Sequence, residues 1–105
     1  REYNQKRPCI EVGDLCMHLD SQRVMRGQEH VELTPREYAL LEYLAMRQGQ
    51  VVSRAEIWEH VYDFNSDATS NVVDVYIGYL RRKTEEAGEA RIVFTVRGVG
   101  YTVKA

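Results

Sequence analysis

The chain has 105 residues, of which 44% are hydrophobic and 29% charged, with a formal net charge of −2. This length supports a single hydrophobic core and therefore one domain. No apolar run approaches the roughly 20 residues that cross a bilayer, and no secretory signal pattern is present, so we expect a cytoplasmic protein without a membrane span. The chain begins at Arg1 rather than Met, which suggests a piece of a longer protein.

Charge is distributed unevenly along the chain. Residues 1–68 carry 8 basic and 12 acidic side chains, whereas residues 69–105 carry 6 and 4. A net negative charge argues against nucleic-acid binding, because phosphate contacts need Lys and Arg. The basic excess near the C-terminus, which includes three consecutive cations at residues 81–83, answers part of that objection.

The first part of the chain predicts a small sheet. Residues 1–8 are polar and predict a linker or disordered segment, and residues 9–105 predict one domain. Four short runs are separated by turn residues, and we expect a strand in each: 9–12, 15–19, 22–26 and 29–33. These strands form an antiparallel meander that must pack on other elements, since so small a sheet is marginal alone.

Two cysteines, Cys9 and Cys16, fall in the first two predicted strands, and His18 is close by. They do not make a disulfide framework for a chain of this size. A metal site is conceivable if the strands pair, but a fourth ligand is missing and the spacing is not that of a zinc finger. We therefore predict two reduced, partly buried thiols and no metal or cofactor.

A strong helix start follows the sheet. Thr34 can cap, Pro35 suits the first helical position, and Glu37 completes a capping box. The apolar positions that follow form one face, with Gly49 ending the helix. The inward residues predicted on this face are Tyr38, Leu40, Leu41, Leu44 and Ala45.

A second capping box lies about twenty residues further on. After a brief extended link at residues 51–52, Ser53 and Glu56 open a short helix whose inward residues are Ile57, Trp58 and Val61. Residues 62–68 then form a polar loop without periodicity.

A third helix is expected over residues 69–87, with Gly88 ending it. On a helical wheel, one stripe of mostly apolar residues faces the core: Val73, Ile77, Leu80 and Thr84. The opposite side carries Asn71, Val75, Gly78 and Arg82, with Val72 and Tyr79 at its edge.

Two interpretations of this outward side stay open on the residues alone. In the first, Val72, Val75 and Tyr79 pack against another part of the domain. In the second, the apolar groups contact thymine methyls and Asn71 pairs with adenine. The basic run at residues 81–83 either complements the helix dipole or contacts phosphates. Asp74 and Arg81 share one flank of the helix and could orient each other.

The end of the chain predicts a β-hairpin. Residues 92–96 and 101–103 alternate in polarity around the turn at residues 97–100, which contains two glycines. Arg97 is either part of a plain turn or a cation placed to enter a narrow minor groove.

Four motifs occur in order between residues 33 and 103: LTPREYALLEYL, VVSRAEIWEHVY, SNVVDVYIGYLRRK and FTVRGVGYTV. With the preceding strands, this segment resembles the C-terminal effector domain of the OmpR/PhoB family of bacterial two-component response regulators. The resemblance implies an α+β fold, a winged helix-turn-helix with an N-terminal four-stranded antiparallel sheet, three helices and a C-terminal β-hairpin wing.

The resemblance also implies sequence-specific binding of double-stranded DNA, with helix 69–87 in the major groove and wing 92–103 at the minor groove. The positions that match base-facing residues of the family are Asn71, Val72, Val75, Tyr79 and Arg97. The positions that match phosphate contacts are Arg54, Tyr76, Arg81, Arg82, Thr95 and Tyr101. The loop that matches a contact with RNA polymerase contains Asp63, Phe64, Asn65 and Asp67.

Gly78 and Tyr79 depart from the family pattern, since several well-known members carry two basic residues there. Base preference therefore does not transfer, and we expect fewer phosphate contacts. For the full-length protein, the resemblance implies a receiver domain, a cognate histidine kinase, and dimers on tandem half-sites of promoter DNA. We expect the isolated domain to be a monomer.

Two other classes of function compete with DNA binding. For an enzyme, the three histidines are scattered and neither a nucleophile elbow nor a phosphate-cradling loop is present, so we expect no catalysis. The alternative to DNA binding is a winged helix that works as a protein-interaction module. The net acidity favours that alternative, and the wing Arg97 with the basic run argues against it.

Overall fold

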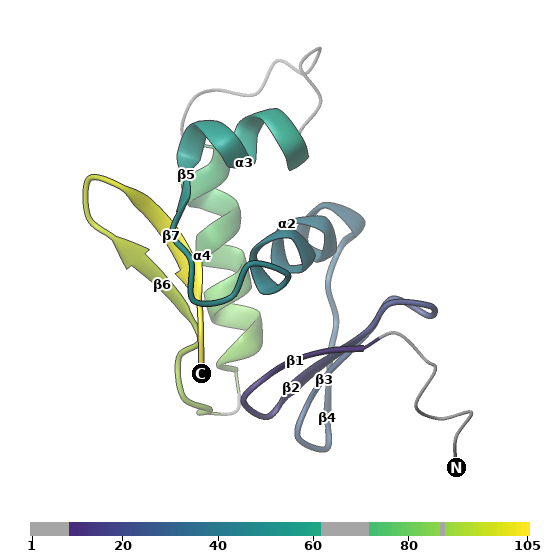
Figure 1. Ribbon diagram of the computed structural model, residues 1–105. Helices are drawn as coiled ribbons and strands as arrows, with labels where there is room; N and C mark the ends of the chain where they lie inside the picture. The colour runs from purple at the N-terminus through teal and green to yellow at the C-terminus, as the bar shows by residue number, and fades with distance from the viewer. Residues whose placement is uncertain (1–8, 62–71, 87) are drawn as a thin grey trace.

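The computed structural model describes residues 9–61, 72–86 and 88–105 (Figure 1). Its elements in chain order are β1 (Cys9–Val12), β2 (Leu15–His18), β3 (Arg23–Arg26), β4 (Glu29–Val31), α2 (Pro35–Ala45), β5 (Val52–Ser53), α3 (Arg54–Val61), α4 (Val72–Thr84), β6 (Val93–Val96) and β7 (Gly100–Val103). The predicted order of sheet, three helices and hairpin is confirmed. Within the described ranges, no helix combines the length and apolarity that a membrane span needs.

The N-terminal sheet is an antiparallel meander in the order β1-β2-β3-β4, as predicted. Its register sets Cys9 opposite His18 and Cys16 opposite Met25. Since successive side chains of a strand point to opposite faces, one face of the sheet is apolar and the other is mixed. The apolar face is buried and comprises Val12, Leu15, Met17, Val24 and Val31.

The helices α2 and α4 lie between this sheet and the hairpin of β6 and β7 (Figure 1). All three helices and both sheets contribute to one core. The buried side chains from the helices include Leu40, Leu41, Leu44, Ile57, Ile77 and Leu80, and those from the hairpin include Val93 and Val103. Burial of these apolar groups is the main stabilising term for a domain of this size.

The start of α2 has the predicted capping box. The Glu37 backbone N–H donates to Thr34 Oγ1 at 3.2 Å, and the Thr34 N–H donates to Glu37 Oε1 at 2.9 Å. The helix ends at Ala45 rather than continuing to Gly49. Gly49, at a φ of 87°, instead donates its N–H to the Val103 carbonyl at 2.9 Å, so this turn is attached to β7.

Only half of the predicted capping box forms at the start of α3. The Glu56 N–H donates to Ser53 Oγ at 3.1 Å, as expected. The Glu56 carboxylate, however, accepts from the Tyr43 hydroxyl at 2.7 Å instead of turning back to Ser53. This hydrogen bond connects α3 to α2, and the requirement of another helix outweighs the local motif.

The C-terminal hairpin is part of a three-stranded sheet in the order β5-β7-β6, which the sequence did not predict. The expected link at residues 51–52 contributes β5, whose Val52 pairs with Tyr101 and whose Ser53 pairs with Gly100. A Cβ atom at Gly100 would overlap the Val52 carbonyl oxygen, so only glycine permits this approach. The short β5 thereby fixes the wing to the beginning of α3.

The inward stripe of α4 is confirmed, since Val73, Ile77, Leu80 and Thr84 are all buried. The helix ends at Thr84, short of the predicted residue 87, and its expected start at residue 69 lies outside the described residues. The side chain of Arg26 explains this end of the helix: it donates to the carbonyls of Thr84 at 2.8 Å and Ala90 at 2.6 Å. Carbonyl groups at a helix C-terminus need such external partners.

Candidate nucleic-acid interface

One side of α4 is exposed, and its residues are those that the helical wheel placed outward. Val75 is 39% exposed and Tyr79 is 36% exposed. Gly78 and Arg82 are also exposed. We call these four residues, Val75, Gly78, Tyr79 and Arg82, the α4 outer face. The guanidinium carbon of Arg82 lies 5.3 Å from the centre of the Tyr79 ring, within range of a cation–π interaction.

The apolar and aromatic residues on this side of the helix differ in burial. Val72 is half-buried and packs against the core, whereas Val75 and Tyr79 are exposed. The rings of Tyr76 and Tyr79 make an edge-to-face contact with centres 5.4 Å apart, and this contact restricts the orientation of the Tyr79 ring. Asn71 lies outside the described residues.

Gly78 leaves an open position in the middle of the α4 outer face. A Cβ atom added there would meet nothing within 4 Å. Packing in the free domain therefore does not require a glycine. Because Gly78 has no side chain, the surface between Val75 and Arg82 is recessed, and a partner can approach the helix backbone closely there.

The basic run at residues 81–83 is divided among three different environments. Arg81 donates through Nε to the Val93 carbonyl at 3.0 Å and through Nη2 to Thr95 Oγ1. Lys83 forms an ion pair with Glu37 at 2.7 Å. Of these three cations, all of which the structure describes, Arg82 alone is exposed. The run therefore supplies less positive surface than its sequence indicates.

The pKa directions agree with this internal use of the basic run. Burial lowers the pKa of Arg81, and the nearby Arg91 adds to the effect. Burial alone would raise the pKa of Glu37, but hydrogen bonds from Lys83 and Thr34 outweigh it, and the pKa lies below the ordinary value of 4.5. Both groups hold elements of the fold together: Arg81 connects α4 to β6, and Glu37 connects α2 to α4.

Asp74 joins three elements at the base of the wing. Its carboxylate pairs with Arg54, at 3.0 Å between Nη2 and Oδ2, and accepts the hydroxyl of Tyr101. The predicted partnership of Asp74 with Arg81 is wrong, because Arg81 turns toward β6. The hydrogen bonds that Arg54 makes with Tyr101 and Asp74 raise its pKa. This network fixes the orientation of α4 relative to α3 and β7.

Several predicted phosphate-contact residues lie around one hollow between the start of α3 and the wing. It is lined by Arg54, Thr95, Val96, Gly98, Val99, Gly100 and Tyr101. Of these, Arg54 and Thr95 are exposed, whereas Tyr101 is only 6% exposed. Burial and the hydrogen bond to Asp74 raise the pKa of Tyr101. The hydroxyl of Tyr101 thus serves the Asp74 network from inside the domain.

The tip of the wing is a three-residue turn that exposes Arg97 and Val99. Gly98 adopts a φ of 74°, and the Val99 N–H donates to the Val96 carbonyl at 2.9 Å to close the turn. Val99, which the sequence did not single out, is 57% exposed. The predicted RNA polymerase contacts lie outside the described residues: Asp63, Phe64, Asn65 and Asp67.

The arrangement defines a class of protein. The helix α4, with its exposed apolar and aromatic face, follows α3 in the order of a helix-turn-helix, and a β-hairpin with a cation at its tip lies beside it (Figure 1). This is a winged-helix DNA-binding domain.

The chain matches, over residues 27–103, the family described as "Transcriptional regulatory protein, C terminal". It belongs to this family, as an effector domain of the OmpR/PhoB type.

Known proteins similar to this chain agree with that assignment. Response regulator MprA of Mycobacterium leprae is 45% identical over 95 residues, which are 90% of this chain and 42% of that protein. The RstA DNA-binding domain of Klebsiella pneumoniae, solved in complex with the RstA box, is 31% identical with a TM-score of 0.79, covering 91% of this chain and 96% of that one. The AdeR DNA-binding domain, solved in complex with an intercistronic region, is 30% identical with a TM-score of 0.80, covering 90% and 97%. The chain thus spans less than half the length of the curated relatives it matches.

Proposed function

We propose that this chain binds double-stranded promoter DNA sequence-specifically, as the output domain of a bacterial two-component response regulator. In this proposal α4 enters the major groove and the wing lies at the minor groove. The observation that carries the proposal is the α4 outer face, where Val75 and Tyr79 stay exposed although they are apolar and aromatic. A solvated helix face would normally carry charged side chains at these positions.

Base recognition falls to the exposed apolar groups of α4 and to the wing. Val75 and the ring of Tyr79 suit contacts with thymine methyl groups, and Arg97 suits a narrow minor groove. Asn71 is assigned an adenine contact, and Val72 an edge contact near the helix start. The half-burial of Val72 supports a smaller share for it than for Val75.

Attachment to phosphates falls first to the exposed cation Arg82, with Thr95 and Tyr76 as hydroxyl donors. Arg54 is exposed as well but also pairs with Asp74, so its contribution is smaller than that of Arg82. Of the predicted contacts, Arg81 and Tyr101 act instead as positioning residues. Their hydrogen bonds to β6 and Asp74 support that assignment, since they set the angle between α4 and the wing.

The whole protein carries further proposals. Its relatives are named response regulators and are more than twice the length of this chain. We assign it a receiver domain, a cognate histidine kinase and a cytoplasmic location, with dimers on tandem half-sites and a monomeric isolated domain. The segment with Asp63, Phe64, Asn65 and Asp67 is assigned to RNA polymerase. The role of the chain is binding, not catalysis.

Selection of duplexes from a random pool at low salt, followed by a salt titration on the selected duplex, tests the proposal. We expect the selected duplexes to share a half-site sequence. The logarithm of the binding constant should fall with the logarithm of the salt concentration with a slope near −3, since about three phosphates are neutralised and each contributes about −0.9. If no duplex is retained at low salt, DNA binding is refuted. The exposed Val75, Tyr79 and Val99 then serve a protein partner, as the alternative function requires.

A further inference from the structure

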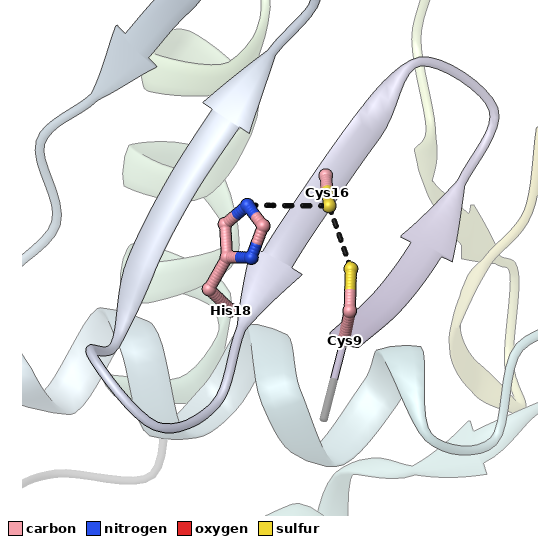
Figure 2. A group of neighbouring side chains, drawn as sticks. All are labelled: Cys9, Cys16 and His18. Atoms are coloured by element: carbon pink, nitrogen blue, oxygen red, sulfur yellow. Dashed lines mark hydrogen bonds between the residues drawn. The ribbon is translucent and has the colours of Figure 1, made fainter. Parts of the chain in front are cut away.

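The outer face of the N-terminal sheet, opposite the core, brings two thiols and an imidazole together. Cys9 pairs with His18 across β1 and β2, and Cys16 lies two positions from His18 on β2, so the three share one face. Figure 2 shows both sulfur atoms and the imidazole ring pointing toward one another. The Sγ atoms of Cys9 and Cys16 are 2.7 Å apart, and Cys16 Sγ lies 3.5 Å from His18 Nε2.

The distances suit a shared metal ion. The three ligand atoms all lie within 4.8 Å of one another. Bonds of about 2.3 Å to sulfur and 2.0 Å to nitrogen at a tetrahedral ion set the sulfur–nitrogen separation at about 3.5 Å and the sulfur–sulfur separation at about 3.7 Å. Cys16 and His18 already match the first value. The second requires Cys9 to retreat by about 1 Å, which its exposed position at the start of an edge strand permits.

One further sulfur atom, the thioether of Met25, lies on the same face of the sheet as the three candidate ligands. Met25 lies directly opposite Cys16 on β3, so its half-buried thioether shares the same face. Thiolate and thioether sulfur with imidazole nitrogen favour Zn²⁺ or Cu⁺ over harder ions. Closed structural zinc sites use four protein ligands, whereas open sites use three and one solvent position, so an ion bound here would keep one solvent position.

A disulfide between the two cysteines fits less well. Cys9 and Cys16 are diagonal neighbours, since Cys9 is paired with His18 and Cys16 with Glu11. A disulfide would also leave His18 without a role in the cluster.

We propose that Cys9, Cys16 and His18 bind one thiophilic metal ion of the class that contains Zn²⁺ and Cu⁺. The ion joins β1 to β2 on the face of the sheet turned away from the core. Binding therefore stabilises the edge strand without any change in the packing of the helices. In this respect the inference is independent of DNA binding.

The test uses the 105-residue chain, reduced with a non-thiol reductant and kept free of oxygen and metal. Addition of Co²⁺ as a spectroscopic probe should give thiolate charge-transfer absorption that saturates at one equivalent. Zn²⁺ should displace Co²⁺ with a dissociation constant below about 1 μM and raise the thermal midpoint of unfolding. A parallel titration with Cu⁺ against a Cu⁺-specific chelator decides between the two ions.

Matched variants locate the site. Cys9→Ser, Cys16→Ser and His18→Gln should each weaken binding by more than the roughly 10- to 100-fold that loss of an outer hydrogen-bonding partner costs. His30→Gln, which changes an exposed histidine on the same sheet, should bind as the wild type does. Far-ultraviolet circular dichroism checks that all four variants fold, which their position away from the core favours.

Three results would overturn the proposal. The first is the absence of saturable binding by the reduced chain to either ion. The second is His18→Gln binding as tightly as the wild type, which would leave two thiols without an imidazole. The third is a purified chain whose mass is two hydrogens lower, with a Cys9–Cys16 disulfide that gains no metal affinity after reduction.

Discussion

At the scale of single residues, Tyr79 is the side chain on which base recognition by α4 most depends. Tyr79 is exposed, and its ring makes an edge-to-face contact with Tyr76 and lies within cation–π range of Arg82. An aromatic ring fixed in this way presents a large apolar surface at little cost in conformational entropy. It replaces the cation that several family members carry at this position, so it favours contact with bases over attraction to phosphates.

Tyr79→Ala should therefore change which duplexes are selected from a random pool. Affinity for the wild-type site should fall by about 1–3 kcal/mol, with a smaller loss on unrelated sequences. The thermal midpoint serves as the control for folding, since Tyr79 lies outside the buried stripe of α4. An equal loss on every sequence would show that Tyr79 contacts phosphate.

Gly78 offers a matched pair of substitutions on the same face. Gly78→Ala should stabilise the domain by up to about 1 kcal/mol through helix propensity, because its Cβ meets nothing within 4 Å. Gly78→Lys should add one phosphate contact and steepen the salt dependence by about 0.9 in slope. Unfolding in urea and salt titrations measure the two effects. If both variants lose affinity equally, DNA approaches the backbone at Gly78 and the added cation cannot be accommodated.

At the scale of elements, the contacts between helices and strands decide which charged residues remain available to a partner. Glu37 illustrates this, because it closes the capping box of α2 and also pairs with Lys83 of α4. Its folded-state pKa lies below 4.5, so folding favours the charged form. The stability contributed by Glu37 is complete above pH 4.5 and is lost as pH falls through the folded-state pKa.

Glu37→Gln should lower the free energy of unfolding at pH 7 by about 1.5–3 kcal/mol, the range for hydrogen bonds to charged groups. The deficit should shrink as the pH falls below 4.5, where the wild-type carboxylate becomes protonated. Urea unfolding at several pH values measures both effects, with Glu86→Gln as the control at an exposed glutamate. A deficit that does not change with pH would contradict a role for the charge of Glu37.

The wing is the second element with a testable role. Arg97 is exposed at its tip, whereas Arg81 and Tyr101 hold its base through β6 and Asp74. Arg97→Ala should weaken DNA binding by about 1–3 kcal/mol and leave the unfolding midpoint unchanged. Arg23→Ala, at an exposed position on β3, provides a matched control that should bind normally. An Arg97→Ala variant with wild-type affinity would exclude the wing from recognition.

Periodicity and capping signals predicted the parts of the fold that depend on neighbours along the chain. The inward stripe of α4 and the capping box of α2 are such parts. The two-residue β5 could not be predicted, because it exists only by pairing with β7 where Gly100 permits close approach. The different environments of residues 81–83 could not be predicted either, since the partners of Arg81 and Lys83 come from β6 and α2.

The cluster of Cys9, Cys16 and His18 shows the same limit. The spacing of Cys9, Cys16 and His18 matches no zinc-finger pattern, and the sequence interpretation set a metal aside for that reason. The antiparallel register of β1 and β2 is what places the three on one face. The turn at residues 13–14 could have revealed that register, since a two-residue hairpin loop sets the pairing of its strands.

At the scale of the whole molecule, some cationic side chains bind partners inside the domain and others are exposed on its surface. Arg26 is buried between the N-terminal sheet and the end of α4, and Arg81 and Lys83 bind internal partners. Arg82 and Arg97 remain exposed on the elements assigned to DNA, as does Arg54, which also pairs with Asp74. A net charge of −2 is therefore compatible with DNA binding, because the relevant quantity is the local charge of α4 and the wing.

The most direct test of this account is a map of amide chemical shifts on addition of the selected duplex to the isotopically labelled chain. We expect the largest changes at the α4 outer face and at residues 97–99 of the wing. The outer face of the N-terminal sheet, with Cys9, Cys16 and His18, should be unaffected. Changes concentrated on α2 or the N-terminal sheet, with α4 and the wing unperturbed, would contradict the assignment of α4 as the recognition helix.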